Sequence, residues 1–235
     1  MSQRTALVTG GTRGIGRAIA ETLLKRGDKV IVTGTKPDGQ PPAGASFEVI
    51  DFTDGVAIQA FADRVAAMNI DILVNNAGTN KIAPFAEIEP KDFALIQAVN
   101  VTAPFLLSRA VLAHMKKRGW GRIVNISSIW GKISRAQRGS YSTSKFALDG
   151  MTAALAAEVA KDGILANCVS PGFIDTELTQ RMLGADGLAQ VVQEIPLGRL
   201  GNVDEIATFV SWLAGPENTY ISGQNIAIDG GFTRV

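Results

Sequence analysis

Residues 5–16, TALVTGGTRGIG, decide the fold of this chain. The first half is a short, partly β-branched apolar run ended by two glycines, which predicts a buried strand. The second half opens a helical pattern of apolar residues at Ile15, Ile19 and Leu23, which Gly27 closes. A strand that passes through a glycine-rich turn into a helix is the first unit of an α/β fold. Glycines in such a turn let the backbone approach a pyrophosphate at the helix N-terminus.

The rest of the sequence repeats this alternation of strands and helices. Further strands are predicted at residues 29–33, 47–50, 71–74, 122–127, 164–169 and 225–228. Further helices are predicted at about residues 56–68, 93–117, 140–161 and 203–213. Because the strands are apolar on both faces, they indicate a parallel sheet covered by helices on each side. We therefore expect an α/β fold, a single doubly wound Rossmann-type domain spanning residues 1–235.

The composition excludes several classes of protein. Of the 235 residues, 46% are hydrophobic and 19% are charged, which is typical of a compact globular chain. The formal net charge of +1 gives no long-range field for nucleic acid or an anionic membrane. No apolar run reaches the length of a membrane span, and a strand begins within a few residues of Met1, where a signal peptide would lie. We expect a soluble cytoplasmic protein without a nucleic-acid or membrane partner.

Residue types that bind metals are scarce. Cys168 is the only cysteine, which excludes an internal disulfide, and its apolar surroundings predict a buried position. His114 is the only histidine, and we expect it on the surface of a helix. Without a second histidine or cysteine, we expect no metal site.

Polar and glycine-rich segments follow one predicted strand after another. They are residues 10–16, Asp51, residues 75–78, residues 127–128 and residues 171–172. In a doubly wound sheet, ligands bind at the carboxyl ends of the strands. The clustering therefore predicts a ligand site along that edge of the sheet.

Tyr141 and Lys145 stand four residues apart in a predicted helix, so both side chains rise from one face. Tyrosine is a poor acid–base group at neutral pH because its reference pKa is near ~10. An ammonium ~4 Å away would favour the phenolate by about 4 kcal/mol at an effective dielectric constant of ~20, before desolvation is subtracted. Taken alone, the pair fits either an acid–base centre or an exposed aromatic ring beside an exposed lysine.

Six motifs in order resemble the short-chain dehydrogenase/reductase family. The spacing of Gly10, Gly14 and Gly16 departs from the dinucleotide fingerprint G-x-G-x-x-G and matches the Thr-Gly-x-x-x-Gly-x-Gly of this family. The other five motifs are residues 75–78 (NNAG), Asn100, Ser128, the Tyr141/Lys145 pair and residues 171–172 (PG). The resemblance covers about residues 5–231, and it implies a seven-stranded sheet in the order 3-2-1-4-5-6-7.

The resemblance implies a role for each catalytic candidate. Tyr141 would be the general acid–base that protonates the substrate oxygen as hydride reaches the carbon. Lys145 would lower the pKa of Tyr141 and hold the ribose of the nicotinamide. Ser128 would hydrogen-bond the substrate oxygen, with Ser127 as the competing serine, and Asn100 would support a proton relay through water.

The same resemblance implies a nicotinamide cofactor, with NADPH favoured and NAD(H) as the alternative. An acidic residue at the end of the second strand would bind the 2′-hydroxyl of NAD, but the chain has no carboxylate there until Asp38. Arg13 and Lys36 instead favour a 2′-phosphate, although Lys36 also fits an exposed loop residue without a ligand. The expected cofactor-binding residues are Gly10, Thr12, Arg13, Gly14, Ile15 and Gly16 at the glycine turn; Thr35 and Lys36 after the second strand; Asp51 and Phe52 for the adenine; Asn76, Ala77 and Gly78; Tyr141 and Lys145; Pro171 and Gly172; and Ile174 and Thr176 for the nicotinamide carboxamide.

Within the family, the chain most resembles 3-oxoacyl-[acyl-carrier-protein] reductases. The similar segments are residues 6–24, 171–176, 196–201 and 204–207. This likeness predicts reduction of a 3-oxoacyl thioester, with a small ketone, sugar or polyol as the second hypothesis. One departure is Asp162, which follows Lys161 where a second cation would meet an acidic carrier, although Arg118 and Arg138 remain.

Two rival hypotheses stay open. The first is an NAD-dependent alcohol, sugar or polyol dehydrogenase that works in the oxidative direction. The second is a binding protein that keeps the cofactor fold without catalysis. The presence of both Tyr141 and Lys145 disfavours the second.

Further expectations concern substrate access and assembly. Residues 173–200 lack strong periodicity, and we expect them to form a substrate lid. We expect Trp130 and residues 133–137 to line the substrate pocket. The resemblance also implies a homotetramer that buries the helices at residues 93–117 and 140–161.

Overall fold

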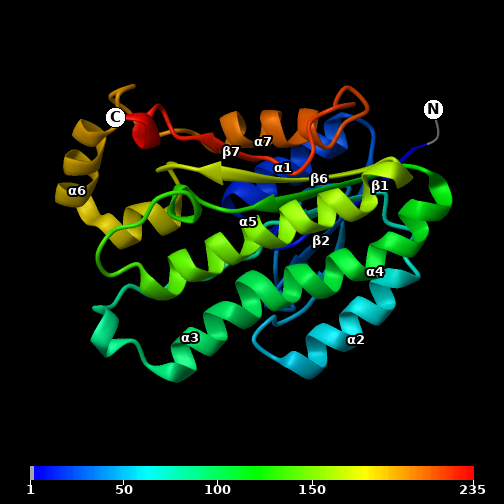
Figure 1. Cartoon of the computed structure of the whole chain (residues 1–235), viewed down its shortest axis with the longest axis horizontal. Coiled ribbons are helices and arrows are strands. Elements are labelled where there is room, and N and C mark those ends of the chain that lie inside the picture. Colours follow the sequence, from blue (N-terminus) through cyan, green and yellow to red (C-terminus); the bar gives the residue numbers. More distant parts are fainter. Residues whose placement is uncertain (1–2) are drawn as a thin grey trace.

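The computed structural model describes residues 3–235, and its centre is a seven-stranded parallel sheet (Figure 1). The strand order β3-β2-β1-β4-β5-β6-β7 confirms the predicted order. The strands are β1 (Thr5–Val8), β2 (Lys29–Gly34), β3 (Ser46–Val49), β4 (Ile72–Asn75), β5 (Gly121–Ile126), β6 (Ile164–Pro171) and β7 (Asn225–Ile228). The strand order reverses between β1 and β4, so the crevice at their carboxyl ends is where a ligand is expected.

Helices cover both faces of the sheet, which confirms the doubly wound α/β fold (Figure 1). One face carries α2 (Gly55–Ala66), α4 (Ala103–Arg118) and α5 (Gly139–Val159). The other carries α1 (Gly14–Lys25) and α7 (Val203–Leu213). Single 3₁₀ turns lie at Phe85–Glu87, Ile129–Gly131, Ala160–Asp162 and Phe232–Arg234.

The core forms two layers because successive residues of a strand point to opposite faces of the sheet. In β1, Leu7 packs into the layer beneath α2, α4 and α5, whereas Ala6 and Val8 pack into the layer beneath α1 and α7. In register, Val8 pairs with Val32 of β2 and Val74 of β4. Leu7, Ile31 and Leu73 pack into the opposite layer, so β1, β2 and β4 are apolar on both faces, as the sequence predicts.

The helix predicted at residues 93–117 is not continuous. α3 (Pro90–Gln97) passes into a π-helical turn, η2 (Ala98–Thr102), before α4 begins. The prediction of one regular helix is therefore wrong at Asn100, which lies in this turn. A π turn breaks the regular i→i−4 hydrogen bonding, and such turns are frequent at functional sites.

Residues 173–200 contain a helix that the sequence analysis missed. α6 (Glu177–Glu194) begins at the Thr176 N-cap and is broken at Gly184, where φ is 63° and ψ is 179°. Val191 is its one buried side chain, so the helix lacks the apolar stripe from which periodicity is read. α6 lies beyond the carboxyl end of β6 (Figure 1).

The segment Pro90–Arg118 is longer and more apolar than the sequence analysis expected of any part of the chain. By length and composition alone it is apolar enough to cross a membrane, with a mean hydropathy of 1.4 over an 18-residue window. The expectation that no stretch reaches this length is wrong by that measure, which tolerates a few charged residues. In the fold, α4 lies between α2 and α5, and its buried side chains join the core layer (Figure 1).

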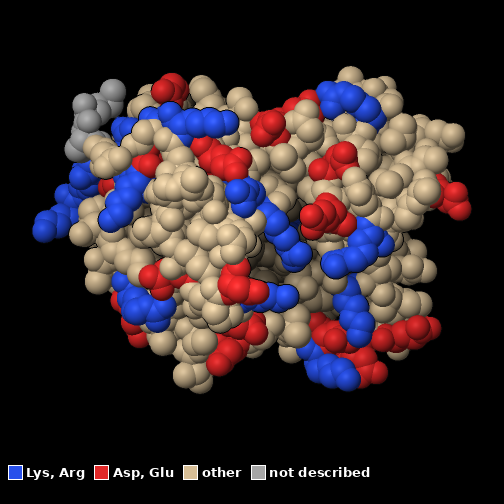
Figure 2. All heavy atoms as spheres, turned by 180° about the vertical axis from the view of Figure 1, so that it is seen from behind, with Lys and Arg blue, Asp and Glu red and all other residues tan. Residues whose placement is uncertain are grey.

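Cys168 and His114, the two residues considered as metal ligands, each contact another protein side chain. Cys168 is fully buried, as predicted, and its Sγ lies 3.1 Å from the Thr152 hydroxyl. His114 is partly buried rather than on open surface, because its Nε2 lies 3.1 Å from Asp71 Oδ1. Across residues 3–235, no group of three or more His, Cys, Asp or Glu side chains is arranged to hold a metal ion. Cationic and anionic side chains are interspersed on the face in Figure 2, in keeping with the small net charge.

Candidate active site

The glycine-rich turn between β1 and α1 is shaped by close contacts. Gly10 and Gly14 have φ angles of 66° and 53°, which glycine adopts without strain. A side chain at Gly16 would place its Cβ 2.3 Å from both the Gly10 carbonyl oxygen and Asn76 Nδ2. A Cβ at Gly14 would meet only the Thr176 methyl group, at 3.9 Å. The turn is therefore tight on its inner side and open at Gly14.

The N-terminus of α1 is free to bind an anion. Its N-cap residue, Arg13, makes no side-chain capping hydrogen bond, and its first turn holds no acidic residue. The first N–H groups of a helix lack intrahelical acceptors, and the helix dipole favours negative charge there. Arg13 is exposed, and Thr12 and Ile15 are partly exposed beside it. This end of the helix, with its open glycine turn, fits a pyrophosphate group.

The segment after β4 is tied to the glycine turn. Asn76 Nδ2 donates to the carbonyl oxygens of Thr9 at 2.9 Å and Gly10 at 3.2 Å. The Thr9 hydroxyl accepts from the N–H groups of Asn76 and Ala77, both at 2.9 Å. The Asn76 side chain is therefore used to brace the turn, and Gly78 is left exposed beyond it.

Asn100 joins this segment to α5. Its Oδ1 accepts from the Thr79 N–H at 2.9 Å, and its Nδ2 donates to the Thr79 carbonyl at 2.9 Å and to Ser144 Oγ at 3.0 Å. A Cβ at Gly78 would lie 3.5 Å from Asn100 Oδ1 and 3.7 Å from Lys145 Nζ. Because the amide is occupied by protein partners, a water relay at Asn100 would have to use its backbone.

Ser128 and Tyr141 meet beyond the carboxyl end of β5. Ser128 Oγ accepts from the Trp130 N–H at 3.2 Å, and the Ser128 hydroxyl lies close enough to the Tyr141 side chain to lower the pKa of that phenol. Ser127 Oγ instead donates to the Lys145 carbonyl oxygen at 3.3 Å. Of the two competing serines, the structure brings Ser128 to Tyr141.

The electrostatics of Tyr141 differ from the sequence-based expectation. Burial raises the pKa of Tyr141, while the Ser128 hydrogen bond and the charge of Arg138 lower that pKa. Lys145 was expected to lower the pKa of Tyr141, but the groups that lower it in the structure are Ser128 and Arg138. Lys145 Nζ donates to the Ile126 carbonyl oxygen at 2.8 Å and lies 5.5 Å from the centre of the Tyr141 ring. Burial lowers the pKa of Lys145 itself to about 8.

The residues expected to bind the adenosine half lie after β2 and β3. Arg13, Thr35 and Lys36 are exposed. Arg13 and Lys36 form no ion pair within residues 3–235. Asp51 is exposed after β3, whereas Phe52 is only 4% exposed and lies in the core. An adenine contact at residue 52 is therefore limited to its backbone.

In the segment after β6, the residues expected to bind the cofactor also make contacts within the protein. A side chain at Gly172, which follows Pro171, would place its Cβ 2.8 Å from Asp229. Ile174 is 5% exposed and belongs to the core layer beneath α1 and α7. The Thr176 hydroxyl accepts at 3.2 Å from the N–H three residues on and so caps α6. The expected carboxamide contacts at Ile174 and Thr176 would therefore come from backbone groups.

A cavity of about 520 Å³ lies beside the first turns of α5. Its lining residues are Phe85, Ser134, Arg135, Ala136, Gln137, Gly139, Ser142, Thr143 and Phe146. Of the expected residues 133–137, residues 134–137 line it and Ile133 does not. Trp130 does not line it either, because its ring packs edge-on against Phe173 and Phe232, each at 6.2 Å. Tyr141 is not among the lining residues. We therefore place the reacting carbonyl of a substrate at the hydroxyls of Ser128 and Tyr141 rather than in this cavity.

Arg138 is the functional candidate whose position sequence reasoning missed. The sequence marked it only as a cation available to an acidic carrier. Its place three residues before Tyr141 was the available signal, but the direction of a long side chain is set by packing that no motif records.

Comparisons with known proteins agree along the whole chain. A family model described as enoyl-(acyl carrier protein) reductase matches residues 10–233. The chain is 39% identical to the 3-oxoacyl-[acyl-carrier-protein] reductase FabG of Salmonella typhimurium over 240 residues, covering 99% of this chain and 98% of that protein. It is 38% identical to the FabG of Aquifex aeolicus over 242 residues, covering 97% and 96%.

Solved structures have the same fold. A gluconate 5-dehydrogenase from Burkholderia cenocepacia, in complex with NADP and tartrate, superposes with a TM-score of 0.92 at 32% identity, covering 100% of this chain and 97% of that one. ElxO with NADP bound superposes with a TM-score of 0.90 at 29% identity, covering 100% of both chains. With the six ordered motifs and the strand order, these matches show that the chain belongs to the short-chain dehydrogenase/reductase family and is an NAD(P)-dependent oxidoreductase acting on CH–OH groups.

Proposed function

We propose that the protein is an NADPH-dependent carbonyl reductase, which transfers hydride between the cofactor and a ketone or secondary alcohol. The observation that carries the proposal is that the Tyr141 and Ser128 side chains lie together at the carboxyl edge of the sheet, where Ser128 lowers the pKa of Tyr141. Two hydroxyls that converge on one point can hold a carbonyl oxygen and give it a proton. The glycine turn and the free N-terminus of α1 lie on the same edge.

Each residue has a definite part in this reaction. A nicotinamide cofactor, when bound, would supply the hydride for the carbonyl carbon. The carbonyl oxygen takes the proton of the Tyr141 hydroxyl as the C=O double bond becomes single, which leaves a phenolate. Ser128 stabilises the charge that develops on that oxygen by a hydrogen bond. Lys145, beside Gly78, would hold the ribose hydroxyls, and the backbone at Asn100 would order the water that returns a proton to Tyr141.

NADPH is the proposed cofactor. Arg13 and Lys36 place two exposed cations near the end of β2 without an acidic partner, which favours a 2′-phosphate over a 2′-hydroxyl. Both solved structures named above were obtained with NADP. The proposed contacts at residues 52, 174 and 176 are made by the backbone, since their side chains serve the core or cap a helix.

A 3-oxoacyl thioester is the first substrate hypothesis. The support is the whole-chain similarity to proteins named 3-oxoacyl-[acyl-carrier-protein] reductase. The cavity beside α5 is bordered by Phe85, which is 81% exposed and would suit an acyl chain. Docking of an acidic carrier is less supported, because Lys116 pairs with Asp162 at 3.2 Å at the position where a second cation was expected.

A small keto compound or sugar acid is the second hypothesis. The support is the TM-score of 0.92 to a gluconate 5-dehydrogenase with tartrate bound. In this case the protein would work on a small polar substrate, in the reductive or the oxidative direction.

The proposal extends to architecture and location. Residues 1–235 form one domain, with residues 173–200 as a substrate lid, because α6 lies beyond the strand ends and has one buried side chain. A cytoplasmic homotetramer is proposed because a nicotinamide cofactor is available inside cells and because α4 and α5 expose Phe105 and Phe146.

A substrate panel with both cofactors tests the proposal. Purified protein is assayed with 3-oxoacyl thioesters, small ketones and keto sugar acids, each with NADPH and with NADH. We expect ketone reduction with a higher kcat/KM for NADPH, and Lys36→Glu should reverse that preference. A clear preference of the wild type for NADH would contradict the reading of Arg13 and Lys36, and no reduction of any ketone would contradict the reductase itself.

A further inference from the structure

Arg138 is a half-buried cation that lies over the ring of Trp130, two residues beyond Ser128. It immediately precedes α5, three residues before Tyr141. Its guanidinium carbon lies 5.4 Å from the centre of the Trp130 ring. The N–H of Trp130 donates to Ser128 Oγ, so Arg138 rests on the segment that carries Ser128. Its charge acts on the Tyr141 hydroxyl from there.

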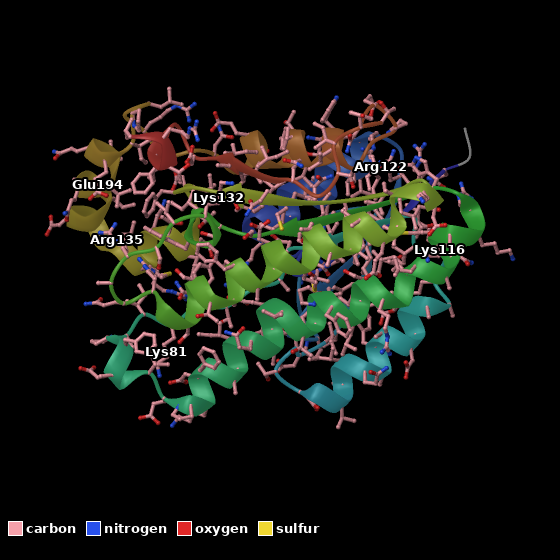
Figure 3. All side chains as sticks on the ribbon, viewed as in Figure 1. Lys81, Lys116, Arg122, Lys132, Arg135 and Glu194 are labelled. Carbon is pink, nitrogen blue, oxygen red and sulfur yellow. The ribbon has the colours of Figure 1, made fainter. Side chains whose placement is uncertain are left out.

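The neighbouring cation has a counter-charge and Arg138 does not. Arg135 also lies over the Trp130 ring, at 5.7 Å, but its Nη1 pairs with Glu194 Oε2 at 3.6 Å (Figure 3). Within the described residues 3–235, Arg138 forms no ion pair. Burial, and then the charge of Arg135, lower the pKa of Arg138, whereas Tyr141 raises that pKa. A partly desolvated cation without a counter-charge is unfavourable, and an anionic ligand would offset that penalty.

We propose that Arg138 binds an anionic group of the substrate, a carboxylate or a phosphate, and so directs the enzyme toward small acidic keto compounds. This inference rests on the proposed carbonyl reduction and narrows its substrate class. A guanidinium offers a planar fork of donors that matches either anion. Its place beside Tyr141 requires the anion to lie within a few bonds of the reacting carbonyl. The keto end of a 3-oxoacyl thioester carries no such charge, so this role of Arg138 favours the second substrate hypothesis, a small keto compound or sugar acid, over the first.

Two simpler roles for Arg138 make different predictions. A residue that only modulates the pKa of Tyr141 would affect acidic and neutral substrates alike. A residue that only packs on Trp130 would affect thermal stability and would leave substrate preference unchanged. The preference between acidic and neutral ketones is therefore the informative measurement.

The experiment compares ketones that differ only in the anion. The pairs are 3-oxobutanoate with its methyl ester and dihydroxyacetone phosphate with dihydroxyacetone, each reduced with NADPH. Arg138→Gln should raise KM for the acidic member of at least one pair roughly tenfold or more and change the neutral member less than about twofold. Arg138→Lys should recover part of the loss. As a control, Lys25→Gln removes one exposed charge at the far end of α1 and should change neither.

Each outcome decides a separate point. The pair that responds identifies the anion as carboxylate or phosphate. Equal losses on acidic and neutral members, no loss on either, or a wild-type preference for the neutral member of both pairs would overturn the role of Arg138 while leaving the reductase intact. If the wild type reduced no ketone with either cofactor, the proposed function and this inference would both fall. If Arg138→Gln fails to fold, Arg138→Lys takes its place, and equal changes in KM for the acidic and neutral members would overturn the role of Arg138.

Discussion

Tyr141 keeps its proton at neutral pH, because burial raises its pKa more than Ser128 and Arg138 lower it. Reduction needs the phenol as proton donor, so kcat/KM for reduction should be constant near neutral pH and fall as the pH rises through the raised pKa. Oxidation needs the phenolate as base, so its kcat/KM should rise over the same range. Measuring both directions between about pH 6 and pH 11 checks the sign. Parallel pH dependence in the two directions would contradict this role.

Removal of the hydroxyl alone tests the same residue. Tyr141→Phe keeps the ring and deletes the group that meets Ser128, so kcat should fall by roughly 10²–10⁴-fold. The dissociation constant for NADPH, followed by cofactor fluorescence, should change little. Tyr220→Phe is the matched control, because Tyr220 is 96% exposed. Activity of Tyr141→Phe above about a tenth of wild type would mean that another group supplies the proton.

Sequence motifs placed the short side chains of this site better than the long ones. The family resemblance preferred Ser128 over Ser127, and the backbone after β5 turns the Ser128 hydroxyl to the phenol of Tyr141. Lys145 was expected to lower the pKa of Tyr141, whereas its ammonium donates to the Ile126 carbonyl oxygen and lies 5.5 Å from the centre of the Tyr141 ring. Long cationic side chains take the direction that local packing allows, and this information is not in their spacing.

At the scale of elements, the unit of β1, glycine turn and α1 makes a steric prediction. Gly16→Ala would bring a Cβ to 2.3 Å from Gly10 O and Asn76 Nδ2, so the turn must shift. NADPH should bind roughly tenfold or more weakly, since such overpacking costs about 1–3 kcal/mol. Gly55→Ala, at the start of α2, meets nothing within 4 Å and should bind NADPH like the wild type. If a fluorescence titration gave the two variants equal affinities for NADPH, the glycine turn would not be part of the cofactor site.

Elements with a clear apolar stripe were predicted, and those without one were not. α7 runs over Val203–Leu213 as predicted, with a capping box formed by Asn202 and Glu205. α6 has one buried side chain and a break at Gly184, so periodicity could not reveal it. The π turn at Asn100 was also missed, because hydrogen bonds from Asn100 to Thr79 and Ser144 accompany it across distant segments.

At the scale of the whole molecule, alternation of apolar strands with helices was enough to predict a doubly wound sheet. The order of the strands was not contained in that alternation and came from the family resemblance, since a parallel sheet of this length allows several windings. The site follows from the order. Reversal between β1 and β4 brings the glycine turn and the Asn76 segment together, although 66 residues separate Gly10 from Asn76.

The outer surface of the α4 and α5 layer predicts assembly into a homotetramer. Phe105 on α4 and Phe146 on α5 are 48% and 46% exposed, and burying such side chains favours association by about 25 cal/mol per Å² of apolar area. Sedimentation should give a mass near four times that of the chain, and Phe105→Lys with Phe146→Lys should produce smaller species. Val56→Lys is the control, because Val56 is 82% exposed on α2, outside the proposed interface. A wild-type monomer at micromolar concentration would contradict the assembly, because Phe105 and Phe146 would then stay exposed to solvent.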